Sequence, residues 1–83
     1  MHSPLTLTTH ARSMMHERMI REDWVINTVN SPDRTEERRG DEKHHLKQIP
    51  QAEGKTLRVI INPTTIPPRV ITVFFDTRVQ PRT

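Results

Sequence analysis

Apolar residues in the N-terminal third of the chain recur at spacings of one, three and four residues. The first stripe consists of Ala11, Met14, Met15 and Met19. Such spacing places side chains on one face of a helix. It predicts a first helix over about residues 10–19, with Thr8 or Thr9 as the N-cap.

A second apolar stripe follows directly and has the same period. It consists of Ile20, Trp24, Val25, Thr28 and Val29. Glu22 and Asp23 lie where a helix N-terminus favours negative charge. Pro32 cannot continue a helix and disfavours helical geometry at Ser31. The second helix is therefore predicted over about residues 21–30.

After residue 33 the pattern changes to short segments separated by turn residues. Gly40 and Gly54 mark hairpin turns, and a proline-rich connection covers residues 62–68. The segments between these breaks are residues 34–38, 42–49, 56–62 and 69–76. The last two are rich in Val, Ile and Phe, which favours central strands.

This order predicts an α+β fold in which two N-terminal helices pack on one face of a three- or four-stranded antiparallel sheet. Two helices on one face bury both apolar stripes and leave the other face partly open. The side chains expected to be largely buried are Trp24, Val25, Val59, Ile61, Ile71 and Val73.

The size and composition limit the fold to one small domain. The chain has 83 residues and no cysteine, so we expect a single domain over 1–83 with a thin core, no disulfide, and flexible tails at 1–6 and 79–83. The start of the sequence lacks a secretory signal pattern, and no stretch of 18 apolar residues occurs. We therefore expect a cytoplasmic protein that does not span a membrane. The net charge of +3 suits RNA, DNA or an acidic protein as a partner.

Several short motifs resemble those of a family of compact bacterial toxin-like domains of unassigned function. The segment His-Ala-Arg-Ser-Met-Met-His-Glu-Arg-Met-Ile at 10–20 resembles a family opening that reads His-Ala-x-x-Arg-Met-x-Glu-Arg-Gly-Ile. Asn-Ser-Pro-Asp at 30–33, Leu-Arg-Val-Ile-Ile at 57–61 and Ile-Thr-Val-Phe at 71–74 follow in the family's order. The layout is similar to BrnT and to RelE-like, barnase-like and colicin-like ribonucleases, and it implies metal-independent cleavage of RNA by a toxin that a cognate antitoxin silences.

Three positions depart from that motif. Met14 stands in place of the arginine, Met19 in place of the glycine and Phe74 in place of the tyrosine. Each replacement removes a polar group or a residue of special backbone geometry.

Metal-independent cleavage of RNA needs a base, an acid and cations that stabilise the phosphate. The predicted site residues are His10, Arg18, Lys47, Arg58 and Thr72. His10 is the candidate base, and Thr72 is the orienting hydroxyl. Arg18 falls in the middle of the first apolar stripe, where a guanidinium needs a partner or a cleft. Local hydrogen bonding for His10, packing of the Arg18 stem and solvent-exposed strand faces for Lys47 and Arg58 are the structural alternatives.

No metal or other cofactor is expected. His44 and His45 are neighbours in a predicted strand, so their side chains point to opposite faces and do not easily share a metal. Trp24, Phe74 and Phe75 are predicted to pack in the core, and base stacking is the alternative for them.

Two functions from different classes remain open at this point. The first is a toxin-like, metal-independent ribonuclease. The second is a noncatalytic module that binds nucleic acid or an acidic protein through a cationic sheet face. The sequence does not define the RNA target, the partner or the oligomeric state.

Overall fold

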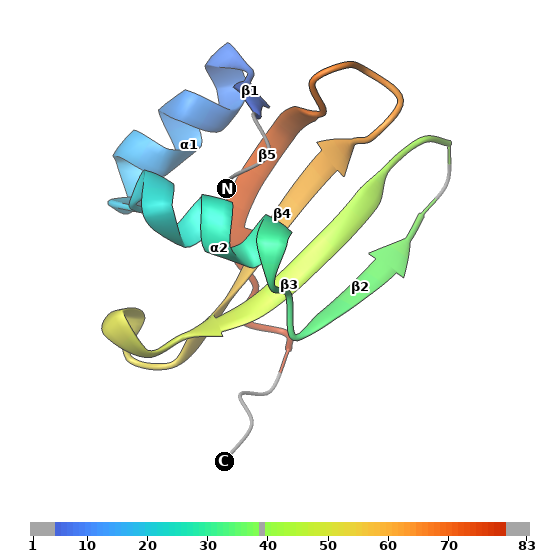
Figure 1. The fold of residues 1–83 in the computed structure, drawn as a ribbon. Helices are drawn as coiled ribbons and strands as arrows, with labels where there is room; N and C mark the ends of the chain where they lie inside the picture. Colours follow the sequence, from blue (N-terminus) through green and yellow to red (C-terminus); the bar gives the residue numbers. More distant parts are fainter. Residues whose placement is uncertain (1–4, 39, 80–83) are drawn as a thin grey trace.

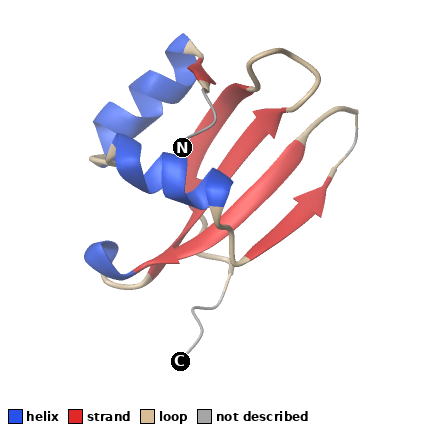
Figure 2. Cartoon of the chain, in the orientation of Figure 1, coloured by secondary structure: helices blue, strands red, loops and turns tan. Residues whose placement is uncertain are grey.

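The protein folds into two helices and a five-stranded sheet (Figures 1 and 2). The structure is a computed structural model and describes residues 5–38 and 40–79. In chain order the elements are β1 (Thr6–Leu7), α1 (Thr9–Arg18), α2 (Glu22–Asn30), β2 (Arg34–Glu37), β3 (Lys43–Ile49), the 3₁₀ turn η1 (Pro50–Ala52), β4 (Lys55–Asn62) and β5 (Arg69–Phe75). The predicted α+β class, both helices and the strands predicted at 42–49, 56–62 and 69–76 are confirmed. The polar segment 34–38, by its sequence an edge strand or an irregular segment, forms the edge strand β2. The tails predicted to be flexible lie mostly outside the described residues.

The sheet is mixed, and its strand order is β1-β5-β4-β3-β2. Strands β2 to β5 form an antiparallel meander, whereas β1 pairs with β5 in parallel, through Thr6 with Arg69 and Leu7 with Val70. The prediction of three or four antiparallel strands is therefore wrong in one respect, because β1 adds a fifth strand that is parallel to its neighbour. A two-residue strand is too short to produce an alternating pattern, and it forms because the chain passes the β5 edge on its way into α1.

Helix α1 is fixed at both ends by local backbone interactions. The Thr8 side chain accepts a hydrogen bond from the Ala11 N–H at 3.0 Å, as an N-cap does. The same hydroxyl donates to the Ile71 carbonyl at 3.0 Å and so ties the start of α1 to β5. At the other end, Met19 adopts the left-handed conformation, with φ of 56°, that usually favours glycine.

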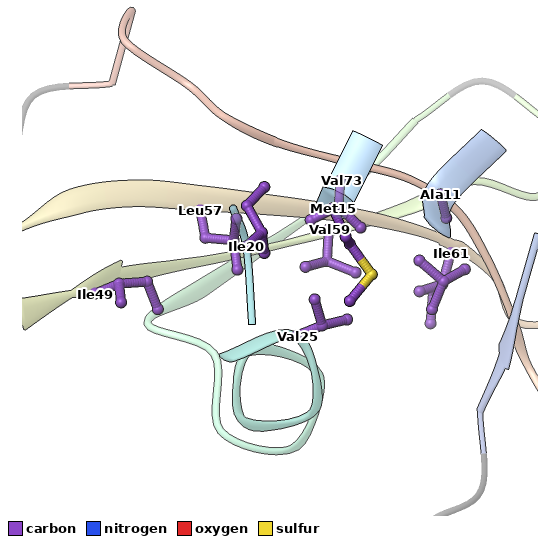
Figure 3. Close-up of a cluster of buried hydrophobic side chains, with 10 residues drawn as sticks. Ala11, Met15, Ile20, Val25, Ile49, Leu57, Val59, Ile61 and Val73 are labelled. Atoms are coloured by element: carbon purple, nitrogen blue, oxygen red, sulfur yellow. The ribbon is translucent and has the colours of Figure 1, made fainter. Parts of the chain in front are cut away.

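The core lies between the helices and one face of the sheet. Figure 3 shows Met15 and Val25 from the helices beside Val59 from β4. Val25, Val59, Ile61 and Val73 are buried, as predicted. Trp24 and Ile71 are only partly buried, so the prediction of full burial is too strong for these two residues.

A bulge in β5 explains the exposure of Ile71. Ile60 pairs with Thr72, but Ile61 pairs with Val70, so Ile71 is an extra residue in the ladder. The extra residue brings both Val70 and Val73 onto the core face, where each is fully buried. Strict alternation along 69–76 does not reveal this shift.

Candidate functional site

The sheet face opposite the helices carries most of the buried charge. Arg58 stands between Leu57 and Val59, two core residues, and successive strand side chains point to opposite faces. Arg58 therefore faces away from the helices. We call this side the open face. Two rows of side chains cross the strands on this face. The first row consists of Arg34, Leu46, Arg58 and Phe74. The second row consists of Glu36, His44, Ile60 and Thr72.

Arg58 is buried and holds two carboxylates. Its side chain is 6% exposed. Nε donates to Oδ2 of Asp76 at 2.7 Å, and Nη1 donates to Oε1 of Glu36 at 3.1 Å. A buried guanidinium is costly without such partners. The structural alternative of a solvent-exposed face does not apply, because Arg58 is the centre of an ion cluster.

Three exposed arginines share the same carboxylates. Arg34 donates to Oε2 of Glu36 at 3.1 Å, Arg38 donates to Oε1 of Glu36, and Arg78 donates to both Asp76 oxygens, at 3.1 and 3.3 Å. Their side chains are 56%, 53% and 80% exposed. We call Arg38 and Arg78 the outer arginines, and these two with Arg34, Arg58, Glu36 and Asp76 the arginine cluster. It contains four guanidiniums and two carboxylates, and it therefore carries two net positive charges.

The cluster keeps both carboxylates ionised. The hydrogen bond from Arg38, followed by that from Arg58, lowers the pKa of Glu36 to about 2. The hydrogen bond from Arg78 is the largest cause that lowers the pKa of Asp76 to about 2, and Arg58 contributes as well. At neutral pH both groups accept hydrogen bonds only, so they hold the guanidiniums in fixed orientations.

His44 adds a neutral imidazole to the open face. Its Nδ1 lies 2.8 Å from Nη1 of Arg58. Because a guanidinium only donates, Nδ1 must be the acceptor and Nε2 carries the proton. Burial and then the charge of Arg58 lower the pKa of His44, which favours the neutral ring. Nε2 is 3.6 Å from Oε1 of Glu42 at the edge of the site.

The two adjacent histidines point to opposite faces, as predicted. His45 pairs with Val59 on the core side and is 6% exposed. Our sequence analysis considered His44 only as a metal ligand and missed its contact with Arg58. In the part of the chain that the structure describes, no three His, Asp or Glu side chains are grouped to hold a metal ion.

A pocket of about 400 Å³ opens beside the arginine cluster. Its lining residues are Arg38, Glu42, His44, Arg58, Phe74 and Arg78. Phe74 was predicted to pack in the core, and this is wrong because its register with Arg58 places it on the open face. For Phe75 the prediction is confirmed: its ring packs against Trp24 with the centroids 6.4 Å apart.

His10 and Thr72 meet at one end of the open face. Nε2 of His10 lies 3.1 Å from Oγ1 of Thr72. Thr8 fixes the start of α1 against β5 and so brings the exposed ring of His10 to this hydroxyl. Thr72 and Phe74 are two residues apart in β5, about 7 Å along the strand. Phe74 lines the pocket, whereas His10 and Thr72 are not among its lining residues.

Lys47 does not join this group. It pairs with Leu57 and therefore faces the helices. Its Nζ donates to the Ser31 carbonyl at the end of α2, at 2.9 Å, and lies 3.9 Å from a carboxylate oxygen of Asp33. The predicted convergence of Lys47 with Arg58 is wrong, because Lys47 of β3 points to the helix side of the sheet and Arg58 of β4 points to the open face.

Arg18 also lies away from the pocket. It is exposed and is the last residue of α1, about 12 Å along the helix from His10. The apolar stripe that contains it is buried only at Ala11 and Met15, and Met19 beyond it is 83% exposed. The helical wheel places Arg18 within the apolar stripe, but the structure leaves its side chain exposed at the last residue of α1.

The chain belongs to the protein family described as a domain of unknown function, DUF4258, whose family model matches residues 7–75. The match begins in β1 and ends with the last residue of β5. It includes His10, Arg58 and Thr72, whereas Asp76 and Arg78 follow it. A search of curated proteins and a search of solved structures gave no match. Among the described residues, no helix is both long and apolar enough to cross a lipid bilayer.

Proposed function

We propose that the protein is a toxin-like endoribonuclease that binds RNA on the open face of its sheet and uses His10 as the base. The observation that carries this proposal is the 3.1 Å contact between His10 and Thr72, a residue of the same strand whose Phe74 lines a pocket with three arginines. An imidazole oriented by a hydroxyl, with guanidiniums on the sheet face that carries this hydroxyl, combines a proton acceptor with phosphate-binding groups.

The reaction follows from the groups that are available. With its Nε2–H donating to Oγ1 of Thr72, His10 accepts the proton of a ribose 2′-hydroxyl at Nδ1, and the 2′-oxygen forms a bond to phosphorus. The bond from phosphorus to the 5′-oxygen breaks, the leaving oxygen takes a proton from water, and the imidazolium returns its proton to the hydroxide that remains. The product ends in a 2′,3′-cyclic phosphate. Thr72 orients the ring, and the exposed guanidiniums of Arg38 and Arg78 stabilise the charge on the phosphate.

A second function is favoured by a different observation. The guanidinium of Arg58 is already neutralised by Asp76 and Glu36, and Arg18 and Lys47 lie elsewhere. A face whose arginine cluster carries two net positive charges and that has fewer catalytic groups suits a noncatalytic module that binds nucleic acid or an acidic protein. In both cases a cognate antitoxin remains a proposed partner, and the cytoplasm remains the proposed location.

The test compares two histidines of the same helix. Purified protein is incubated with a labelled single-stranded RNA in the presence of a chelator, and the products are examined for cyclic phosphate ends. Replacement of His10 by Ala should lower the cleavage rate about 10²- to 10⁴-fold. His16→Ala is the matched control, because His16 is also exposed in α1 and has no described contact with the open face. It should cleave at the wild-type rate.

Thermal melts of both variants establish that they are folded. Equal cleavage by the wild type and His10→Ala would overturn the catalytic proposal and would identify a contaminating nuclease. RNA binding by a wild-type protein that does not cleave would instead support the noncatalytic module. Growth arrest on expression, relieved by His10→Ala, would support the toxin assignment.

A further inference from the structure

The ring of Phe74 has a different environment from that of its neighbour. Phe75 packs against Trp24 and lies under Nζ of Lys55, which is 5.7 Å from its centroid. Phe74 has no such ring or cation partner among the described residues, and it is half-buried in the wall of the pocket. A flat apolar side chain in a polar pocket is suited to stacking with a nucleobase.

The two outer arginines are held in place before any ligand arrives. Arg78 uses Nε and Nη2 to bind both oxygens of Asp76, and Asp76 is itself almost fully buried. Arg38 uses Nη2 to bind Glu36. The remaining N–H groups of each guanidinium have no partner in the described part of the chain. Because these arginines are already ordered, they lose less conformational entropy when they bind a phosphate.

The charge of the pocket limits the kind of anion that it suits. The arginine cluster carries two net positive charges, and the carboxylate of Glu42 at the rim, with a side chain that is 48% exposed, lowers the balance to one. His44 is neutral when its Nδ1 accepts from Arg58. A singly charged phosphodiester matches this balance better than a dianionic phosphate monoester or a triphosphate does.

We propose that this pocket is a subsite for one nucleotide of a single strand, with its base stacked on Phe74 and its phosphodiester bound by Arg38 and Arg78. A volume of about 400 Å³ is in the range of small-ligand sites, roughly 300 to 1,000 Å³. Phe74 of the subsite lies two residues from Thr72, so the nucleotide that the subsite holds is placed along the same strand as the His10–Thr72 pair. This inference deepens the proposed function and rests on RNA as the ligand of the open face.

The test uses a ligand that binds but does not react. A DNA dinucleotide has one phosphodiester and no 2′-hydroxyl, so it measures the subsite without the chemistry. Its affinity for the whole protein is measured by calorimetry, and adenosine and inorganic phosphate are titrated in parallel. We expect the dinucleotide to bind more tightly than either fragment, because only the dinucleotide engages both the ring and the arginines.

Two substitutions test the two halves of the subsite. Phe74→Leu should weaken dinucleotide binding roughly 5- to 150-fold, the range for loss of one stacked base. Phe74→Tyr, which keeps the ring, should retain the wild-type affinity. Arg78→Gln should weaken binding and reduce its dependence on salt. Arg21→Gln is the matched control, because Arg21 is also exposed and also pairs with an aspartate two residues away. It should bind as the wild type does.

Wild-type affinity in both Phe74→Leu and Arg78→Gln would overturn the subsite. Equal affinity for inorganic phosphate and the dinucleotide, unchanged by Phe74→Leu, would also overturn it and would indicate an anion site without nucleotide recognition. Failure of the subsite is distinguishable from failure of the proposed chemistry. Cleavage that depends on His10 but not on Phe74 rejects the subsite alone, whereas dinucleotide binding with no His10-dependent cleavage rejects the chemistry alone.

Discussion

Substitution of Asp76 by Asn tests how far the arginine cluster stabilises the fold. Asp76 joins the end of β5 to β4, because its backbone N–H donates to the Thr56 carbonyl at 2.8 Å. Its carboxylate accepts from Arg58 at 2.7 Å and from the Arg78 backbone N–H at 3.0 Å, and its side chain is 1% exposed. Asn preserves the shape but removes the charge, so Arg58 is left with Glu36 as its only carboxylate partner.

The expected loss follows from the pKa of Asp76. A decrease in this pKa from 3.8 to about 2 corresponds to roughly 2 to 3 kcal/mol of folding stability at neutral pH. Breaking a buried ion pair costs about 3 to 5 kcal/mol, and here Glu36 retains part of the interaction. We therefore expect Asp76→Asn to lower the free energy of unfolding by about 2 to 3 kcal/mol at pH 7. For a domain of this size, that lowers Tm by roughly 10 to 20 °C.

The sign of the pH dependence is fixed by the direction of the pKa change. The carboxylate of folded Asp76 has the lower pKa, so its contribution is fully present above the unfolded value of 3.8. That contribution is lost as the pH falls from 3.8 toward the folded value of about 2. The stability difference between wild type and Asp76→Asn should therefore shrink over the same interval.

The assay is urea unfolding followed by the fluorescence of Trp24, the only tryptophan of the chain, at pH 7 and at steps down to pH 3. Asp41→Asn is the control, because Asp41 is exposed in the turn between β2 and β3. It should change stability by less than about 0.5 kcal/mol. A loss of that small size for Asp76→Asn at pH 7, or a larger loss that stays constant down to pH 3, would refute the reasoning.

The two ends of α1 give two further predictions. Met19→Gly should raise the free energy of unfolding by about 1 kcal/mol, because glycine adopts the left-handed conformation without the Cβ penalty. Met14→Gly is the control and should lower the free energy of unfolding, because Met14 lies inside the helix. A fall in Tm for Met19→Gly would contradict this account. Thr8→Ala should lower the free energy of unfolding by about 1 to 2 kcal/mol, because the Thr8 hydroxyl both caps α1 and binds β5. Thr9→Ala is the control and should have the smaller effect. Equal Tm values for the two variants would count against the role of Thr8.

The helices and the four long strands could be predicted because local signals define them. Helical spacing, Pro32 and the two glycines give the bounds of these elements to within a residue or two. The left-handed Met19 explains in physical terms why a glycine at this position, as in the motif that the sequence resembles, would fit the end of the helix. Strand β1 and the bulge at Ile71 were missed, because both depend on pairing with distant strands rather than on local pattern.

The site was predicted less completely, although part of the necessary signal is present in the sequence. Leu57 and Val59 flank Arg58, so alternation alone assigns Arg58 to the open face. Val73 and Phe75 likewise flank Phe74, so alternation also assigns Phe74 to the open face, whereas Lys47 required the register of β3 on β4. Within the arginine cluster, Arg58 is 18 positions from Asp76 and 22 positions from Glu36 in the sequence, and only the assembled sheet brings these residues together.

The arrangement of these charges separates stability from binding on the open face. Arg58 cannot act as a simple phosphate clamp, because it is buried and a phosphate would have to displace Glu36 or Asp76 before reaching it. The exposed Arg38 and Arg78 keep N–H groups that have no partner among residues 5–38 and 40–79, and they meet no such barrier. Loss of activity on substitution of Arg58 would therefore report damage to the fold as readily as loss of chemistry. Substitution of Arg78 leaves the buried pair between Arg58 and Asp76 in place, so its effect on RNA is the more direct measure of how the open face binds phosphate.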